Sequence, residues 1–123
     1  RRSSDSSRPG PAALASTGIL HVPDPSTPIE ETLRALDDLV RSGKVRYVGT
    51  SGFEAYRLVE ADWVAREIGS NRFICALQQY SLLSREVEAE ILPAMGQYGV
   101  GLIPFFPLAG GMLTRGTASP SEA

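Results

Sequence analysis

The chain has 123 residues, of which 42% are hydrophobic and 21% charged, and its formal net charge at pH 7 is −2. This composition is typical of a soluble globular protein, and the acidic balance provides no basic surface for a nucleic acid or an anionic membrane. The single cysteine, Cys75, argues against an internal disulfide or a cysteine-based metal site, and no apolar run is long enough to span a bilayer, so we expect a cytoplasmic protein without a bound metal.

The two ends of the chain differ in composition from its middle. Residues 1–17 (RRSSDSSRPGPAALAST) are rich in Ser, Pro, Arg and Ala, and residues 117–123 are also small and polar. Such segments have few groups to bury and therefore tend not to order. We expect disordered tails at both ends and one domain over residues 18–116.

Short β-rich runs alternate with helical patterns in the middle of the chain. A first strand is expected over residues 19–21. Thr27 then predicts a helix start as an N-cap residue, with Glu30 completing a capping box, and Gly43 marks the end of this helix. The acidic residues of this helix, including Asp37, are interpreted as a solvated face.

The same alternation continues to residue 105. Pro93 interrupts the last helical pattern, so a short turn followed by a helix from about Leu92 is expected there. The expected elements are strands over 45–50, 73–77 and 101–105, a helix over 53–68 that Gly69 stops, and a helical region over 85–98.

The spacing of these elements predicts an α/β fold. The strands recur at the interval of a strand, a helix and two short loops, which indicates parallel strands with right-handed crossovers. This pattern alone is compatible with a doubly wound sheet or with a barrel. A complete (β/α)₈ barrel needs roughly 250 residues, so four units amount to about half of one.

Three stretches of the sequence resemble the aldo-keto reductase family. Residues 21–53 (HVPDPSTPIEETLRALDDLVRSGKVRYVGTSGF) resemble the family from its fourth to the end of its fifth barrel strand. Residues 78–93 (QQYSLLSREVEAEILP) resemble the loop and helix after the sixth strand, and residues 101–116 (GLIPFFPLAGGMLTRG) the seventh strand and its loop. The resemblance implies a partial (β/α)₈ TIM barrel, a fragment of an enzyme that transfers hydride from NADPH to an aldehyde or ketone.

Two strand ends carry the first candidate site residues. His21 matches the family's catalytic His, which orients the substrate carbonyl and assists proton donation by a tyrosine. A lone His at a strand end more often has a structural role, but the PDPSTP sequence that follows favours the family role. Ser51 matches the Ser of a Ser-Asn pair that binds the nicotinamide carboxamide, whereas Gly52 replaces the Asn. An alternative role for Ser51 is that of a helix N-cap.

Further cofactor contacts are implied near the last strand. Phe105 matches an aromatic residue that stacks on the nicotinamide ring, and a core aromatic is the alternative interpretation. Leu108 and Gly110 match a loop whose backbone approaches the pyrophosphate. Leu77 occupies the position of a family Gln that contacts the carboxamide, and the adjacent Gln78 is expected to face the other side of its strand.

The remaining catalytic groups of the family do not match residues of this chain. These groups are the proton-donating Tyr and its neighbouring Lys and Asp, and Lys44 and the tyrosines present lie at other positions. We therefore expect an aldo-keto reductase by resemblance, with a small carbonyl compound as substrate, whose 123 residues are inactive alone. The alternative is a non-catalytic barrel fragment that acts by association through exposed strand edges.

Overall fold

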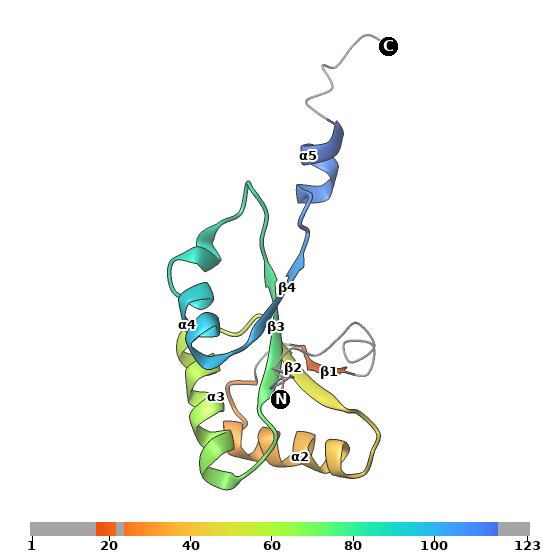
Figure 1. Ribbon diagram of the computed structural model, residues 1–123, viewed down its shortest axis with the longest axis vertical. Helices are drawn as coiled ribbons and strands as arrows, with labels where there is room; N and C mark the ends of the chain where they lie inside the picture. Colours follow the sequence, from red (N-terminus) through yellow and green to blue (C-terminus); the bar gives the residue numbers. More distant parts are fainter. Residues whose placement is uncertain (1–16, 22–23, 116–123) are drawn as a thin grey trace, which may run out of the picture.

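The computed structural model describes residues 17–21 and 24–115. Figure 1 shows strands and helices alternating along the chain, with α5 at the opposite end of the molecule from α2. The elements are β1 (Thr17–Leu20), α2 (Ile29–Arg41), β2 (Tyr47–Ser51), α3 (Ala55–Ile68), β3 (Phe73–Gln79), the 3₁₀ helix η1 (Glu86–Glu88), α4 (Ile91–Tyr98), β4 (Gly101–Phe105), the 3₁₀ helix η2 (Ala109–Gly111) and α5 (Met112–Arg115).

The strands form one parallel sheet in the order β1-β2-β3-β4. Four parallel strands with connecting helices confirm the predicted α/β class and the predicted part of a TIM barrel. The expected tails lie outside the described residues, except that Thr17 begins β1. The short turn and helix predicted around Pro93 are present as η1 and α4.

The core lies between the sheet and helices α2, α3 and α4. Side chains of alternate strand positions, Val48 and Ala76 among them, pack with Leu33, Leu58 and Met95 of the helices. Successive residues of a strand point to opposite faces. We call the face away from this core the open face; it carries alternate residues of each strand.

A glycine in β2 brings the neighbouring strands together on the open face. A Cβ atom at Gly49 would lie 2.5 Å from the Cys75 sulfur and 2.8 Å from Cδ1 of Ile19. Cys75 is buried, as the sequence predicts for a small apolar residue in a strand. Side chains of β1 and β3 therefore meet over the bare backbone of β2.

The start of α2 differs from the prediction. Pro28 occupies the N-cap position and no side chain caps the helix. The Thr27 hydroxyl instead donates to Asp24 at 2.8 Å, and both the N–H and the hydroxyl of Ser26 donate to the same carboxylate. The Ser26 hydrogen bonds lower the pKa of Asp24. A carboxylate accepts several hydrogen bonds at once, so it takes the hydroxyl that the capping box would have used.

Asp37 is buried, so its interpretation as part of a solvated face is wrong. Its carboxylate accepts hydrogen bonds from Arg41 at 2.5 Å and from the backbone and side-chain N–H groups of Asn71 at 2.8 and 2.7 Å. These bonds, from Arg41 first and then from Asn71, lower the pKa of Asp37 to about 2. The carboxylate thereby joins α2 to the turn that enters β3.

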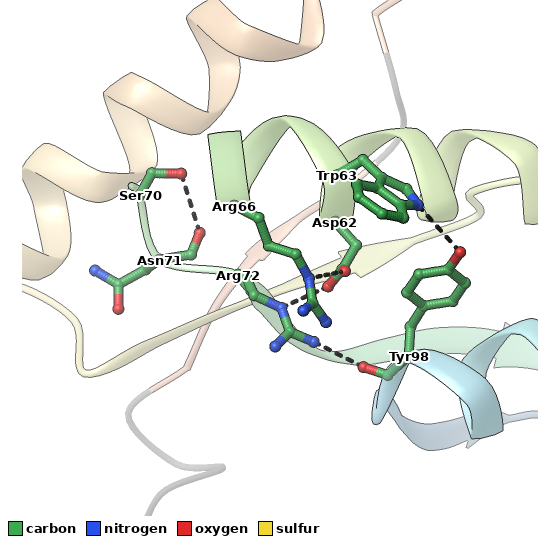
Figure 2. Close-up of polar contacts among 7 residues, drawn as sticks. All are labelled: Asp62, Trp63, Arg66, Ser70, Asn71, Arg72 and Tyr98. Carbon is green, nitrogen blue, oxygen red and sulfur yellow. Dashed lines mark hydrogen bonds and ion pairs between the residues drawn. The ribbon is translucent and has the colours of Figure 1, made fainter. Parts of the chain in front are cut away.

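A second buried carboxylate, that of Asp62 in α3, binds Arg72, the residue after Asn71, as Figure 2 shows. The Asp62 side chain is 3% exposed and accepts from Arg66 at 2.7 Å and from Arg72 at 2.5 Å. Arg72 also donates to the backbone carbonyl of Tyr98, the last residue of α4, at 2.8 Å. The Tyr98 hydroxyl accepts from the Trp63 indole N–H at 3.1 Å. These contacts tie α3, β3 and α4 together at the amino end of the sheet.

Candidate functional site

Three of the predicted site residues lie at one edge of the sheet. His21 directly follows β1, Ser51 is the last residue of β2, and Phe105 is the last residue of β4. Because these strands are parallel, their carboxyl ends share one edge. Barrel enzymes build their active sites at this end of the strands.

The register also places Ser51 and Phe105 on the same face. Ser51 pairs with Leu77, and Phe105 pairs with Gln79, two residues further along β3. Paired residues of parallel strands and residues two apart point to one side of the sheet. Since Ala76 packs in the core, this side is the open face.

Ser51, the residue expected to contact the nicotinamide carboxamide, has a hydroxyl that is available for a hydrogen bond. Ser51 is 8% exposed, and no described residue hydrogen-bonds its hydroxyl. The N-cap of α3 is Glu54, so the alternative role of Ser51 as a helix cap is wrong. Gly52, in the position of the family's Asn, has φ of 69° and donates its N–H to the Leu77 carbonyl at 3.2 Å.

Gln78 is directed away from the open face, as predicted. Its side-chain amide is buried and donates to the Phe53 carbonyl at 2.9 Å. Leu77, with its apolar side chain, takes the position on the open face. Of the polar residues that the resemblance assigns to the carboxamide, Ser51 is therefore the one present on this face.

The loop after β4 contains the remaining predicted cofactor contacts. The Phe105 ring is half-buried and meets the Phe106 ring edge-on, with centroids 5.7 Å apart. Leu108 is 52% exposed, and its carbonyl accepts the N–H of Gly111 at 3.0 Å. Gly110 has φ of 67°, a conformation that favours glycine.

A cluster of polar side chains that was not predicted from the sequence lies on the segment after β3. The Tyr80 hydroxyl donates to Glu88 at 2.7 Å, and Arg85 donates to both oxygens of that carboxylate at 2.7 and 3.1 Å. The hydrogen bond to Glu88 raises the pKa of Tyr80, and the bond from Arg85 lowers the pKa of Glu88. The Arg-x-x-Glu spacing at Arg85 and Glu88 was the signal in the sequence for this pair.

The described part of the chain contains neither a cluster of metal-binding side chains nor a membrane-spanning helix. Among residues 17–21 and 24–115, no three His, Cys, Asp or Glu side chains form a group that could hold a metal ion. In the same part of the chain, no helix combines the length and the apolar character needed to cross a membrane.

Known proteins resemble the chain over most of its length. The sequence model of the aldo/keto reductase family matches residues 18–123. An aryl-alcohol dehydrogenase-like protein of Schizosaccharomyces pombe is 44% identical over 103 residues, which are 84% of this chain and 29% of that protein. The versiconal hemiacetal acetate reductase of Aspergillus parasiticus is 41% identical over 102 residues, 83% of this chain and 30% of the reductase.

A third relative also matches most of this chain over a small part of its own length. An aldo-keto reductase of Fusarium vanettenii is 42% identical over 96 residues, which cover 78% of this chain and 26% of the relative. The chain thus spans less than a third of the length of these relatives. The order of parallel strands, the residues that end them and the match of residues 18–123 agree: the chain belongs to the aldo/keto reductase family.

Proposed function

We propose that this chain forms one side of the active site of a carbonyl reductase that uses a nicotinamide cofactor, with NADPH as the hydride donor. The observation that carries the proposal is the position of His21, Ser51 and Phe105 at one edge of a parallel sheet. The family to which the chain belongs uses nicotinamide cofactors. We place the enzyme in the cytoplasm and an aldehyde or ketone as its substrate.

The residues at this edge fit a nicotinamide. The Ser51 hydroxyl has no hydrogen-bond partner among the described residues and would bind the carboxamide. Phe105 presents an aromatic ring on the same face for the flat nicotinamide. Gly110 and Leu108 belong to the loop that would approach the pyrophosphate. The bound cofactor supplies the hydride, whereas these side chains only orient it.

His21 would act on the substrate. It is exposed at the end of β1 and is able to donate a hydrogen bond to the carbonyl oxygen as negative charge develops there. The proton itself comes from a tyrosine in this family, and no tyrosine of the 123 residues matches that position. A positioned proton donor contributes roughly 10²–10⁴-fold to the rate, so these 123 residues alone are not expected to turn over substrate.

The names of two relatives support a proposal for the class of substrate. One is of the aryl-alcohol dehydrogenase type and another is a versiconal hemiacetal acetate reductase. By analogy we propose an aryl aldehyde or ketone. The alternative function, association without catalysis, rests on the edge strands β1 and β4, which have no neighbour on one side within the described sheet.

A chimera tests the proposed function. Residues 18–115 would replace the matched segment of the Aspergillus parasiticus reductase, and the product would be assayed with NADPH and nitrobenzaldehyde. We expect turnover by the chimera, while the purified 123-residue chain shows neither turnover nor saturable NADPH binding at low micromolar concentration.

Variants of the chimera then test the roles proposed for Ser51 and His21. Ser51→Ala removes one hydrogen bond and should raise the KM for NADPH by roughly 2- to 13-fold, and His21→Ala should lower kcat. Glu30→Ala, which removes an exposed ion pair on α2, is the matched control. An active chimera in which Ser51→Ala and His21→Ala behave like Glu30→Ala would refute the assignment.

A further inference from the structure

Gln79, the last residue of β3, places an amide side chain on the open face at the carboxyl edge of the sheet. It lies two residues beyond Leu77, which pairs with Ser51, and is itself paired with Phe105. Residues two apart on a strand point to the same side of the sheet. The amide of the preceding Gln78 is hydrogen-bonded in the core, so the two adjacent glutamines serve opposite faces.

The position of Gln79 is fixed by the described strands alone. β3 has β2 on one side and β4 on the other, and the two pairings extend to Leu77 and Gln79. Ser51 ends β2 and Phe105 ends β4. A ligand that contacts the Ser51 hydroxyl and the Phe105 ring at once therefore lies across β3, over Leu77 and Gln79.

The two side chains of β3 present different groups to such a ligand. Leu77 is apolar and partly buried, and so suits the flat part of a ring. Gln79 carries a neutral amide with an acceptor oxygen, and none of the described residues hydrogen-bonds that amide. With strands about 4.8 Å apart and a rise of about 3.3 Å per residue, the Cα atoms of Ser51 and Gln79 are separated by roughly 8 Å. A planar amide group of a ligand fits between two side chains at that spacing.

We propose that Gln79 binds the carboxamide of the nicotinamide together with Ser51, an inference that rests on the proposed function. The resemblance to the family assigns no role to Gln79. A carboxamide has a carbonyl oxygen and two N–H donors. The Ser51 hydroxyl donates to the carbonyl oxygen, and the side-chain oxygen of Gln79 accepts one N–H. Hydrogen bonds from two strands hold the ring in one orientation for hydride transfer.

Binding of an altered cofactor to the chimera tests this role. In the analogue of NADP⁺ that has an acetyl group in place of the carboxamide, a methyl group replaces the NH₂ and the carbonyl oxygen remains. Gln79→Met keeps the length of the side chain and removes its amide. It should weaken NADP⁺ binding roughly 2- to 13-fold and leave binding of the analogue unchanged, as measured by isothermal titration calorimetry. Ser51→Ala should weaken the binding of both, because both have the carbonyl oxygen.

The matched control is Gln97→Met, the same change at an exposed residue of α4 near the amino end of the sheet. It should bind both cofactors as the unaltered chimera does. The unaltered chimera provides a reading that needs no variant: it should bind the analogue less tightly than NADP⁺, and this difference should disappear in Gln79→Met.

The results separate this inference from the proposed function. The role of Gln79 is overturned, and the proposed function stands, if Ser51→Ala weakens NADP⁺ binding while Gln79→Met does not. It is also overturned if Gln79→Met weakens the binding of NADP⁺ and of the analogue equally, because the lost contact is then not to the NH₂ group. Both the role and the proposed function fail if neither variant changes the binding of NADP⁺.

Discussion

The amino and carboxyl ends of this sheet use polar side chains in different ways. At the amino end, Asp37 and Asp62 are buried and each accepts hydrogen bonds from two residues. At the carboxyl end, His21 is exposed and the Ser51 hydroxyl has no partner among the described residues. Polar groups that are satisfied internally contribute to stability, whereas uncommitted ones are free to bind a ligand. The comparison predicts that substitutions at the amino end lower the stability of the fold, whereas substitutions at the carboxyl end leave it almost unchanged.

The largest loss of stability is expected for Asp62→Ala. The carboxylate is 3% exposed, and its removal leaves Arg66 and Arg72 without their common partner. Because both guanidinium groups reach solvent, we expect a decrease of about 2–4 kcal/mol in the free energy of unfolding, below the upper range for buried pairs. Urea denaturation followed by circular dichroism would measure it. The control, Glu30→Ala, removes an exposed pair and should cost about 0.5 kcal/mol or less; equal losses in both variants would contradict the comparison.

A smaller, pH-dependent loss is expected for Asp37→Asn. The folded-state pKa of Asp37 is about 2, below its ordinary value of 3.8. A depressed pKa stabilises the folded state above the ordinary value, and this contribution disappears as the pH falls through the folded-state pKa. At pH 7 we expect a loss of about 1–2 kcal/mol, reduced by the solvent exposure of Arg41.

The pH profile distinguishes this effect from a general loss of packing. The difference in unfolding free energy between the unaltered chain and Asp37→Asn should be constant above pH 5 and should shrink between about pH 4 and pH 2. Asp38→Asn, on the exposed side of the same helix, serves as the control. A difference that persists unchanged at pH 2 would show that the charge of Asp37 is not its source.

The smallest effects on stability are expected at the carboxyl end. His21→Ala removes an exposed side chain, and Ser51→Ala removes a hydroxyl without a partner among the described residues. Each should change the free energy of unfolding by about 0.5 kcal/mol or less. A loss above about 1.5 kcal/mol in either variant would indicate a structural role and would weaken the proposed site.

The sequence predicted the strands better than the helix starts. Periodic apolar residues and the stop at Gly69 place the elements to within a few residues, because burial and left-handed glycines impose strong constraints. The capping box at Thr27 failed because Asp24, three residues earlier, competes for the same hydroxyl. The capping-box pattern covers only Thr27 to Glu30, so it does not show that the Asp24 carboxylate competes for the Thr27 hydroxyl.

The site was predictable only in part, for a related reason. The parallel order of strands places His21, Ser51 and Phe105 at one edge, and strand alternation correctly directs Gln78 to the other side. The burial of Asp37 was not predictable, since its partner Asn71 is 34 residues away. Contacts between distant segments leave no periodic signal, so the sequence indicates the carboxyl end more clearly than the amino end.

The two buried aspartates, Asp37 and Asp62, accept hydrogen bonds from two consecutive residues of the chain. Asp37 of α2 accepts hydrogen bonds from Asn71. Asp62 of α3 accepts a hydrogen bond from Arg72, and Arg72 also donates to the carbonyl of Tyr98, the last residue of α4 (Figure 2). One dipeptide thus connects three helices that are successive in the chain. Such a junction opposes the independent opening of single βα units, because releasing any helix disrupts contacts shared with the next. We therefore expect hydrogen exchange in α2, α3 and α4 to proceed through one common opening rather than through separate ones.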